Sequence, residues 1–129
     1  MSVNYSLPVI NARLQAVANT IDAAGSPGYL IIRDNSGTTL STIQLARPCG
    51  TVNGGILTFT GTLLDPAATA TGTAENAIIT DASGAVMISG LTVGIPLSSA
   101  DIIMSNGLNS TVISVGQVVQ LLSAQITGT

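Results

Sequence analysis

The sequence predicts a mainly β protein, an antiparallel β-sandwich or jelly-roll with one amino-terminal α-helix. Three observations predict this fold class. After Gly28, short apolar runs alternate with turn-forming residues, which indicates roughly seven or eight strands at intervals of about 8–12 residues. Before Gly25, the apolar residues recur at helical spacing. Because this helix precedes the strands, it cannot supply the crossovers of a parallel α/β sheet.

The helix is predicted over residues 7–24 by apolar side chains three or four positions apart, which share one helix face. These side chains are Leu7, Ile10, Leu14, Val17 and Ile21. Ser6 is placed to cap the first turn, Pro8 fits within that turn, and Gly25 is expected to stop the helix. The apolar face could bind a partner. A lone helix beside a sheet normally covers that sheet, however, so we expect the face to pack on the sandwich.

The predicted strands follow from apolar runs that are bounded by turn residues. They cover residues 29–33, 40–45, 56–60, 76–80, 86–93, 101–104, 112–115 and 118–126. The turns at 34–37 and 81–84 share the pattern Asp-x-Ser-Gly, which hints at an internal duplication. In the last strand, the alternate residues Val118, Gln120, Leu122, Ala124 and Ile126 give one mostly apolar face.

The chain length of 129 residues favours a single domain over residues 1–129. Within it we expect an amino-terminal arm over 1–8, the helix over 9–24 and the sandwich over 28–127. In this division residues 7 and 8, the first two helical positions, are counted with the arm. Between the strands, residues 47–50 are expected to be a connection and residues 53–55 a tight turn. Residues 61–74, rich in Thr and Ala, are predicted to form a long loop.

Charged residues are scarce, at 7% of the chain against roughly 25% in typical domains. With three Arg, no Lys and a net charge of −3, the chain has no cationic cluster for phosphates, so we expect no nucleic-acid partner. No apolar run approaches the ~20 residues that span a bilayer, and no signal peptide is visible, so we expect no membrane partner. A surface that is polar mainly through Ser, Thr, Asn and Gln offers little charge repulsion, which indicates a protein packed against neighbours.

Residues that could carry chemistry are few. The chain has no His, the commonest general base, and nothing in the sequence offers a base that would activate the single Cys49, which we interpret as structural. The acids lie in the helix, in turns or at strand edges, and a catalytic pair of them, about 5–9 Å apart across a cleft, stays open as an alternative. These acids are Asp22, Asp34, Asp65, Glu75, Asp81 and Asp101. We therefore predict no catalytic residue, no cofactor and no metal site, and a protein that is not an enzyme.

Three segments resemble small proteins from the structural operons of tailed bacteriophages. They cover residues 11–30, 50–59 and 109–119. In that group the helix similarly ends in Ile-Asp-Ala, as here at Ile21-Asp22-Ala23, before a glycine-rich turn and a strand. The resemblance implies a tailed-bacteriophage head decoration (cement) protein with a jelly-roll-like fold, bound in many copies outside the capsid shell. The chain departs from the group at residues 35–39, where the polar segment is shorter, so the surface formed there is expected to differ.

This resemblance leads us to expect a structural virion protein that bridges neighbouring capsid subunits and stabilises the capsid. It would lie on the outer capsid surface of the virion, and in the host cytoplasm during assembly. Its expected partners are the major capsid protein and itself, as a homodimer or homotrimer. The contacting residues are predicted to be Val3, Tyr5 and Leu7 of the arm, with Leu63 and Leu64 of the loop. The alternative is a structural or adhesin module of the phage tail or neck, although aromatic residues for sugar binding are only 2% of the chain.

Overall fold

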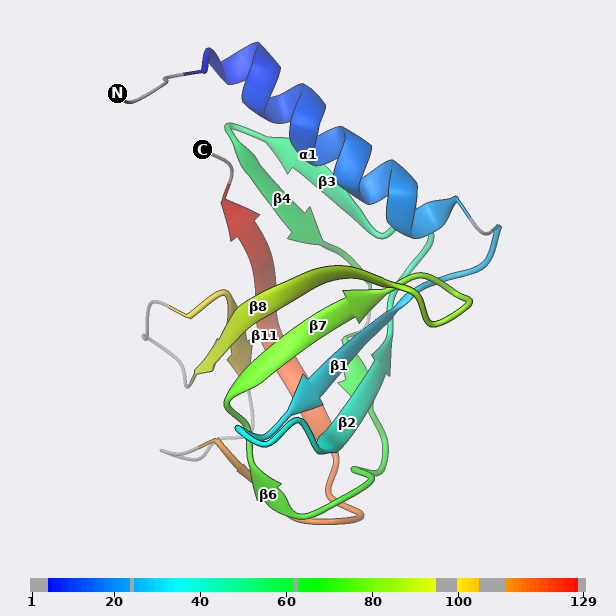
Figure 1. Cartoon of the computed structure of the whole chain (residues 1–129), viewed down its shortest axis with the longest axis vertical. Coiled ribbons are helices and arrows are strands. Elements are labelled where there is room, and N and C mark those ends of the chain that lie inside the picture. The colour runs from blue at the N-terminus through cyan, green and yellow to red at the C-terminus, as the bar shows by residue number, and fades with distance from the viewer. Residues whose placement is uncertain (1–4, 24, 62, 95–99, 105–110, 128–129) are drawn as a thin grey trace.

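The computed structural model describes residues 5–23, 25–61, 63–94, 100–104 and 111–127, to which the structural statements below refer. Helix α1 (Leu7–Asp22) precedes the strands. The strands are β1 (Tyr29–Arg33), β2 (Thr39–Gln44), β3 (Gly50–Asn53), β4 (Ile56–Phe59), β5 (Leu64–Asp65), β6 (Gly72–Thr73), β7 (Asn76–Thr80), β8 (Val86–Gly94), β9 (Ile102–Met104), β10 (Val112–Ile113) and β11 (Val119–Thr127). The fold is mainly β, with one amino-terminal helix and a curled multi-stranded sheet (Figure 1), as the sequence predicted.

One continuous strand path holds most of the sheet. Its order is β2-β1-β7-β8-β9-β11-β4-β3, with β5 paired to β11 beside the path and β6 paired to β10 apart from it. The pairings are antiparallel, as predicted, except that β8 and β9 run parallel over the pairs Val93↔Ile102 and Gly94↔Ile103. This short parallel contact joins one half of the path, β2-β1-β7-β8, to the other half, β11-β4-β3.

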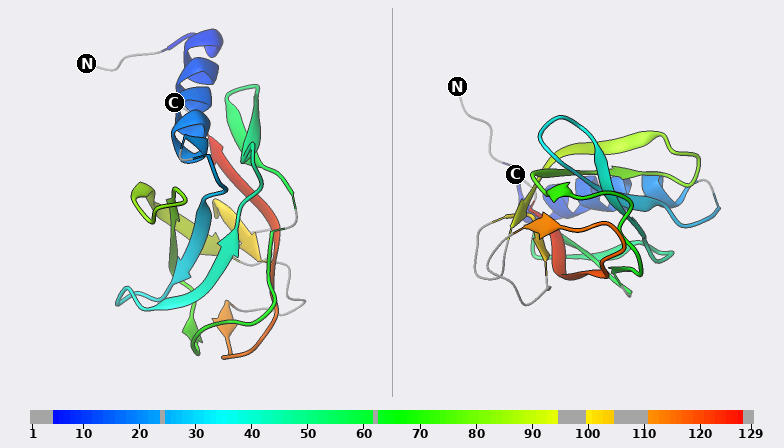
Figure 2. Two further views of the ribbon diagram at one scale, coloured as in Figure 1. Left: turned by 90° about the vertical axis from the view of Figure 1, so that its right-hand side faces the viewer. Right: turned by 90° about the horizontal axis from the view of Figure 1, so that it is seen from below.

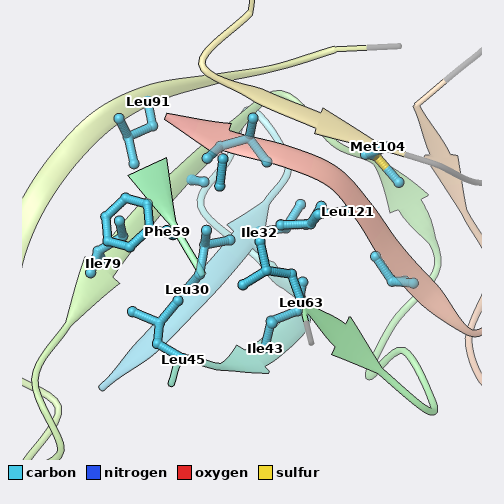
Figure 3. Close-up of a cluster of buried hydrophobic side chains, with 14 of the residues drawn as sticks. Leu30, Ile32, Ile43, Leu45, Phe59, Leu63, Ile79, Leu91, Met104 and Leu121 are labelled. Carbon is cyan, nitrogen blue, oxygen red and sulfur yellow. The ribbon is translucent and has the colours of Figure 1, made fainter. Parts of the chain in front are cut away.

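The core lies where these two halves meet. Figure 3 shows Leu30 and Ile32 of β1 and Ile79 of β7 pointing toward Phe59 of β4 and Leu121 of β11. Their aliphatic neighbours from β2 and β9 are buried in the same cluster. Because side chains of a strand alternate between its two faces, a regular strand contributes every second residue to this core. The burial of β1 alternates in this way, with Leu30 and Ile32 fully buried and the residues beside them partly exposed.

Helix α1 covers the β3–β4 hairpin (Figure 2). Leu14, Ala18 and Ile21 are its buried residues, which confirms the core-facing stripe of the predicted helix for its second half. The helix spans Leu7–Asp22 rather than 9–24, because the Ser6 carbonyl already accepts the amides of Val9 and Ile10 at 3.1 Å. At the other end the backbone passes through Ala23 to Gly25, whose φ of 81° is readily adopted only by glycine.

The prediction missed three of the strands. β3 falls in a segment that was expected to hold a connection and a turn, and β5 and β6 interrupt the loop expected over 61–74. β5 and β6 are two residues long, too short for an alternating pattern to be recognisable. β3 begins with a glycine, where a side chain would meet the carbonyl oxygen of Thr58 only 2.3 Å away. A glycine that signals a turn in the sequence is therefore required here by the close approach of two strands.

Over the first half of β11, the mostly apolar face that the sequence predicted is the exposed one. Val119 and Leu121 face the core, whereas Val118, Gln120 and Leu122 are exposed. The register against β9 shifts between Leu121 and Ser123, where a β-bulge places an extra residue in β11. Beyond the bulge Ala124 is buried, so the alternation changes phase within the strand. A regular period of two cannot reveal this change, since the bulge depends on the neighbouring strand.

The two Asp-x-Ser-Gly turns close two hairpins that lie side by side. β1 pairs with β7, and Ile31↔Ile78 is the central pair of that ladder. These two residues are also equivalent in the local repeat, since residues 31–37 and 78–84 share Ile, Ile, Asp, Ser and Gly in the same order. The β1–β2 and β7–β8 hairpins are therefore arranged about a local two-fold axis at this central pair.

Candidate functional site

The acidic side chains in turns act as hydrogen-bond acceptors for their own backbone. In the first turn, Asp34 Oδ1 accepts the amides of Ser36 and Thr38 at 3.0 and 2.9 Å. In the second turn, Asp81 Oδ1 accepts the amides of Ser83 and Ala85 at 2.9 and 3.0 Å. In addition, the serine of each turn donates its hydroxyl to the same carboxylate. These bonds stabilise the charged form, so the pKa of both aspartates lies below its usual value of 3.8.

Asp65 has a role that the sequence did not reveal. Its carboxylate, buried on β5, accepts the Ser41 hydroxyl at 2.7 Å and the Thr42 amide at 3.3 Å, both from β2. The other carboxylate oxygen accepts the amide of Ala67 at 3.1 Å. Because β5 pairs with β11, Asp65 fastens one end of the strand path to its other half. The Asp-Pro sequence indicated only a turn, so nothing local pointed to this long-range contact.

Asp101 and Asp22 make further links between elements. Asp101 Oδ2 accepts the amide and the hydroxyl of Thr92 at 3.1 and 3.2 Å. Asp22 Oδ2, at the end of α1, accepts the amide of Cys49 at 3.2 Å. The other oxygen of the Asp22 carboxylate is buried and has no hydrogen-bond partner within the described ranges. The carboxylates of Asp22, Asp65 and Asp101 thus connect separate elements of the fold, whereas those of Asp34 and Asp81 bond within their own turns.

Cys49 is fully buried beneath α1. Its thiol donates to the carbonyl oxygen of Ala18 at 3.8 Å. Burial, together with the nearby charge of Asp22, raises the pKa of the thiol to about 11. Near neutral pH the side chain is therefore a protonated thiol without access to solvent, which matches the structural role predicted for it.

The described ranges hold neither a cluster of metal-ligating side chains nor a membrane-spanning helix. No group of three or more His, Cys, Asp or Glu side chains in them is arranged to hold a metal ion. No helix in them is both long and apolar enough to cross a bilayer.

The predicted interaction residues have different environments. Val3 lies outside the described residues. Tyr5 and Leu7 are both about half exposed, and the Arg13 guanidinium stacks 4.9 Å from the centroid of the Tyr5 ring. Leu7 is already the first residue of α1, so the expected arm over 1–8 is shorter than predicted.

Leu63 and Leu64 are not loop residues on a free surface. Leu63 is only 8% exposed and belongs to the core, and its carbonyl oxygen accepts the amide of Leu121 at 2.9 Å. Leu63 therefore does not belong to the exposed interaction surface that the sequence predicted. Leu64 is partly buried in β5, opposite Gln120 of β11. The segment is drawn into the fold because its backbone pairs with β11.

The exposed large apolar side chains gather mainly in two regions. The amino-terminal region holds Tyr5, Leu7 and Val9 at the start of α1. The second region, here called the valine end, holds Val112, Val115, Val118 and Leu122, whose exposed fractions run from 46% to 64%. Figure 1 shows the start of α1 and the orange segment after residue 110 at opposite ends of the longest axis. The two regions thus lie at opposite ends of the molecule.

The valine end is held firmly and carries no charge. The turn at 114–117 exchanges backbone hydrogen bonds with Ala68, at 2.8 Å to Gln117 and 2.9 Å to Gly116, and the Val115 amide donates to Thr71 Oγ1. The stretches 66–74 and 102–129 contain no charged residue. An apolar group on a fixed, uncharged surface loses little entropy on binding a neighbour. The sequence placed Val118 and Leu122 on one mostly apolar face but did not show that this part of the face is exposed. The uncharged carboxyl-terminal stretch was a visible signal for such a surface.

Comparison of the chain with protein-family models, with curated proteins and with solved structures finds no match.

Proposed function

We propose that this chain is a structural virion protein that decorates a tailed-phage capsid and stabilises it by bridging neighbouring capsid subunits. The single observation that carries the proposal is the valine end, an exposed apolar and uncharged surface opposite the apolar start of α1. A protein that binds two neighbours needs two surfaces that face apart. The resemblance of residues 11–30, 50–59 and 109–119 to head decoration proteins supports the same role.

The mechanism requires burial of surface rather than chemistry. Each exposed valine or leucine that becomes covered contributes about 1.5–3 kcal/mol at most, so a few such side chains give one moderate contact. Many copies around a shell would hold each capsid subunit to its neighbours at several points. A subunit could then leave only if all of these contacts broke at the same time. The scarcity of long charged side chains lowers the entropy cost of each contact.

The proposed location is the outer capsid surface, and the proposed partners are the major capsid protein and further copies of this chain. We expect the valine end to contact the capsid protein, because it is the larger of the two exposed apolar regions. The start of α1 would contact a second subunit. In this arrangement the chain needs no cofactor and no nucleic acid.

The copy number in purified virions tests the proposal. Quantitative mass spectrometry against the major capsid protein should give a ratio near one copy per capsid subunit. A few copies per particle would instead indicate the alternative, a structural or adhesin module of the tail or neck. Absence from the particle would overturn both versions.

A binding assay tests the proposed surface itself. The double variant Val118→Ser, Leu122→Ser should reduce co-sedimentation with capsids that lack this protein by at least about tenfold, since it removes roughly two buried side chains. Val86→Ser is the matched control, because Val86 is also more than half exposed but lies on β8, away from the valine end. Equal binding of the double variant and the control would show that the valine end is not the contact surface.

A further inference from the structure

The two ends of the strand path differ in how their outer sides are covered. The outer side of β2 is occupied, because the Leu40 carbonyl accepts the amide of Thr69 at 2.8 Å and the Thr42 amide donates to Asp65. At the other end, β4 is the only described strand that pairs with β3. The β2 end is thus closed to further strands, which leaves β3 as the free edge of the path.

The backbone of β3 presents a short row of unused groups. The register Thr51↔Thr58, together with the bond from the Thr60 amide to the Cys49 carbonyl at 3.0 Å, directs the backbone of Thr51 toward β4. In an antiparallel ladder the intervening residues point the opposite way, so Gly50 and Val52 direct their N–H and C=O groups outward. Within the described ranges, no residue makes a hydrogen bond to these outward groups.

β3 has no charged side chain and no bulge, two of the features that normally protect a sheet edge. Proteins usually block such edges with charged side chains, prolines, bulges or a covering segment. Residues 48–64 contain no charged residue, and the pairing of β3 with β4 shows no register shift. Pro48 lies two residues before the start of β3, so it limits the length of the edge but does not block pairing along β3 itself. The edge is therefore short, regular and uncharged over four residues, and α1 contacts β3 without bonding to its outward backbone groups.

We infer that β3 pairs antiparallel with β3 of a second copy of this chain, about a two-fold axis at Thr51. This register places Gly50 opposite the partner's Val52 and Val52 opposite the partner's Gly50, so all outward backbone groups of both residues are used. Four hydrogen bonds form, and the two sheets become one. Such a contact is isologous and closes as a dimer.

The side chains in this register favour a second copy over an unrelated strand. Thr51 is exposed and lies opposite the partner's Thr51 in a non-hydrogen-bonded pair, where Cβ atoms are about 4.5–5.5 Å apart and Thr–Thr pairs are favourable. Gly50 has no side chain to obstruct the partner's Val52. Val52, which is only partly buried in the single chain, becomes better covered. The β3 pairing would be the contact through which copies of this chain associate in the proposed function. Its role in the particle rests on that proposed function, whereas its geometry does not.

Charge complementation at residue 51 tests the register directly. Sedimentation of the full chain should show a dimer. Thr51→Lys and Thr51→Glu should each raise the dissociation constant of this dimer by at least about tenfold, because like charges then face each other. An equimolar mixture of the two variants should recover the dimer. Thr42→Lys is the matched control, since Thr42 is also an exposed strand residue but lies on the covered edge. Circular dichroism and urea midpoints equal to those of the wild type would show that all variants fold.

A second measurement uses the short distance across the axis. Thr51→Cys should form a covalent dimer under mild oxidation, seen on a non-reducing gel, while Thr42→Cys should not; the native Cys49 is buried and does not compete. A wild-type monomer at all concentrations, or equal crosslinking of both variants, would overturn the inference.

The copy-number measurement separates this inference from the proposed function. A monomeric chain that is still present near one copy per capsid subunit would disprove only the β3 pairing. A chain that dimerises through residue 51 but is absent from virions would disprove only the capsid role.

Discussion

The β1–β2 and β7–β8 hairpins have the same turn but different second strands. Both turns form the same set of hydrogen bonds to an aspartate, and both end in a glycine with φ near 90°. Beyond the turn the hairpins diverge. β2 ends after six residues at one end of the path, whereas β8 continues for nine and joins the parallel strand β9.

A distant aspartate fixes each second strand. Asp65 accepts the Thr42 amide of β2 from a buried position, and Asp101 accepts the Thr92 amide of β8 from a partly exposed one. A short motif thus determines the turn, whereas the course of the following strand depends on residues elsewhere in the chain.

The largest expected effect is in the core beneath the hairpins. Ile32 and Ile79 occupy equivalent positions of the repeat, and both are fully buried. Ile32→Ala and Ile79→Ala should each lower the free energy of unfolding by about 3–4 kcal/mol, through lost burial and the cavity that remains. Urea denaturation measures both. Losses that differ by more than about 1 kcal/mol would show that the two hairpins are not packed equivalently.

The two fastening aspartates should differ clearly. Asp65→Ala leaves the Ser41 hydroxyl and the Thr42 amide without their partner in a buried place, so we expect a loss of about 2–3 kcal/mol in the free energy of unfolding. Asp101→Ala should cost less than about 1 kcal/mol, because water can replace its exposed bonds. The same urea experiment compares them, and similar losses would contradict the distinction between the buried and the exposed link.

The turn glycines should respond alike and more weakly. Gly37 and Gly84 have φ of 89° and 90°, and no atom lies within 4 Å of a Cβ built on either. Gly37→Ala and Gly84→Ala should therefore cost only the backbone strain, roughly 1–2 kcal/mol each. Thermal unfolding of both variants checks this. A neutral effect at one turn alone would mean that the two turns are not equivalent.

The smallest effect concerns acid stability. Because the folded chain lowers the pKa of Asp34, chiefly through the Thr38 amide, and of Asp81, chiefly through the Ser83 hydroxyl, both carboxylates add stability above the ordinary value of 3.8. That stability is lost as the pH falls through the lowered pKa values. Asp34→Asn with Asp81→Asn keeps an acceptor oxygen but removes the titration. The double variant should show a shallower loss of stability between about pH 4 and pH 2 than the wild type, and an unchanged slope would contradict the assignment.

Much of the fold could be predicted because its signals are local. The stripe through Leu14 and Ile21 predicted the buried side of α1, and the strands bounded by Asp34 and Asp81 were predicted within a few residues. The two-residue strands β5 and β6 carry no periodic signal, and the bulge in β11 depends on how β9 lies beside it. For the same reason the sequence placed Leu63 in a surface loop, although it is buried, and did not show that Leu122 is exposed.

The candidate site was less predictable than the fold. The expected absence of catalytic residues rested on residue types, which can be counted directly. The valine end, in contrast, exists because Val118 and Leu122 face outward on one strand while the 114–117 turn is bonded to Ala68. Such a surface joins segments whose proximity is a property of the topology and not of any one segment.

The burial of Cys49 beneath α1 has a practical consequence for following the molecule in solution. A thiol with a pKa near 11 that is sealed by the helix reacts with a disulfide reagent only when the helix lifts from β3 and β4. The rate of modification of the unaltered chain therefore reports how often that opening occurs, without any inserted label. A fluorophore can in turn be attached selectively to a cysteine introduced on the surface, because the native thiol reacts far more slowly.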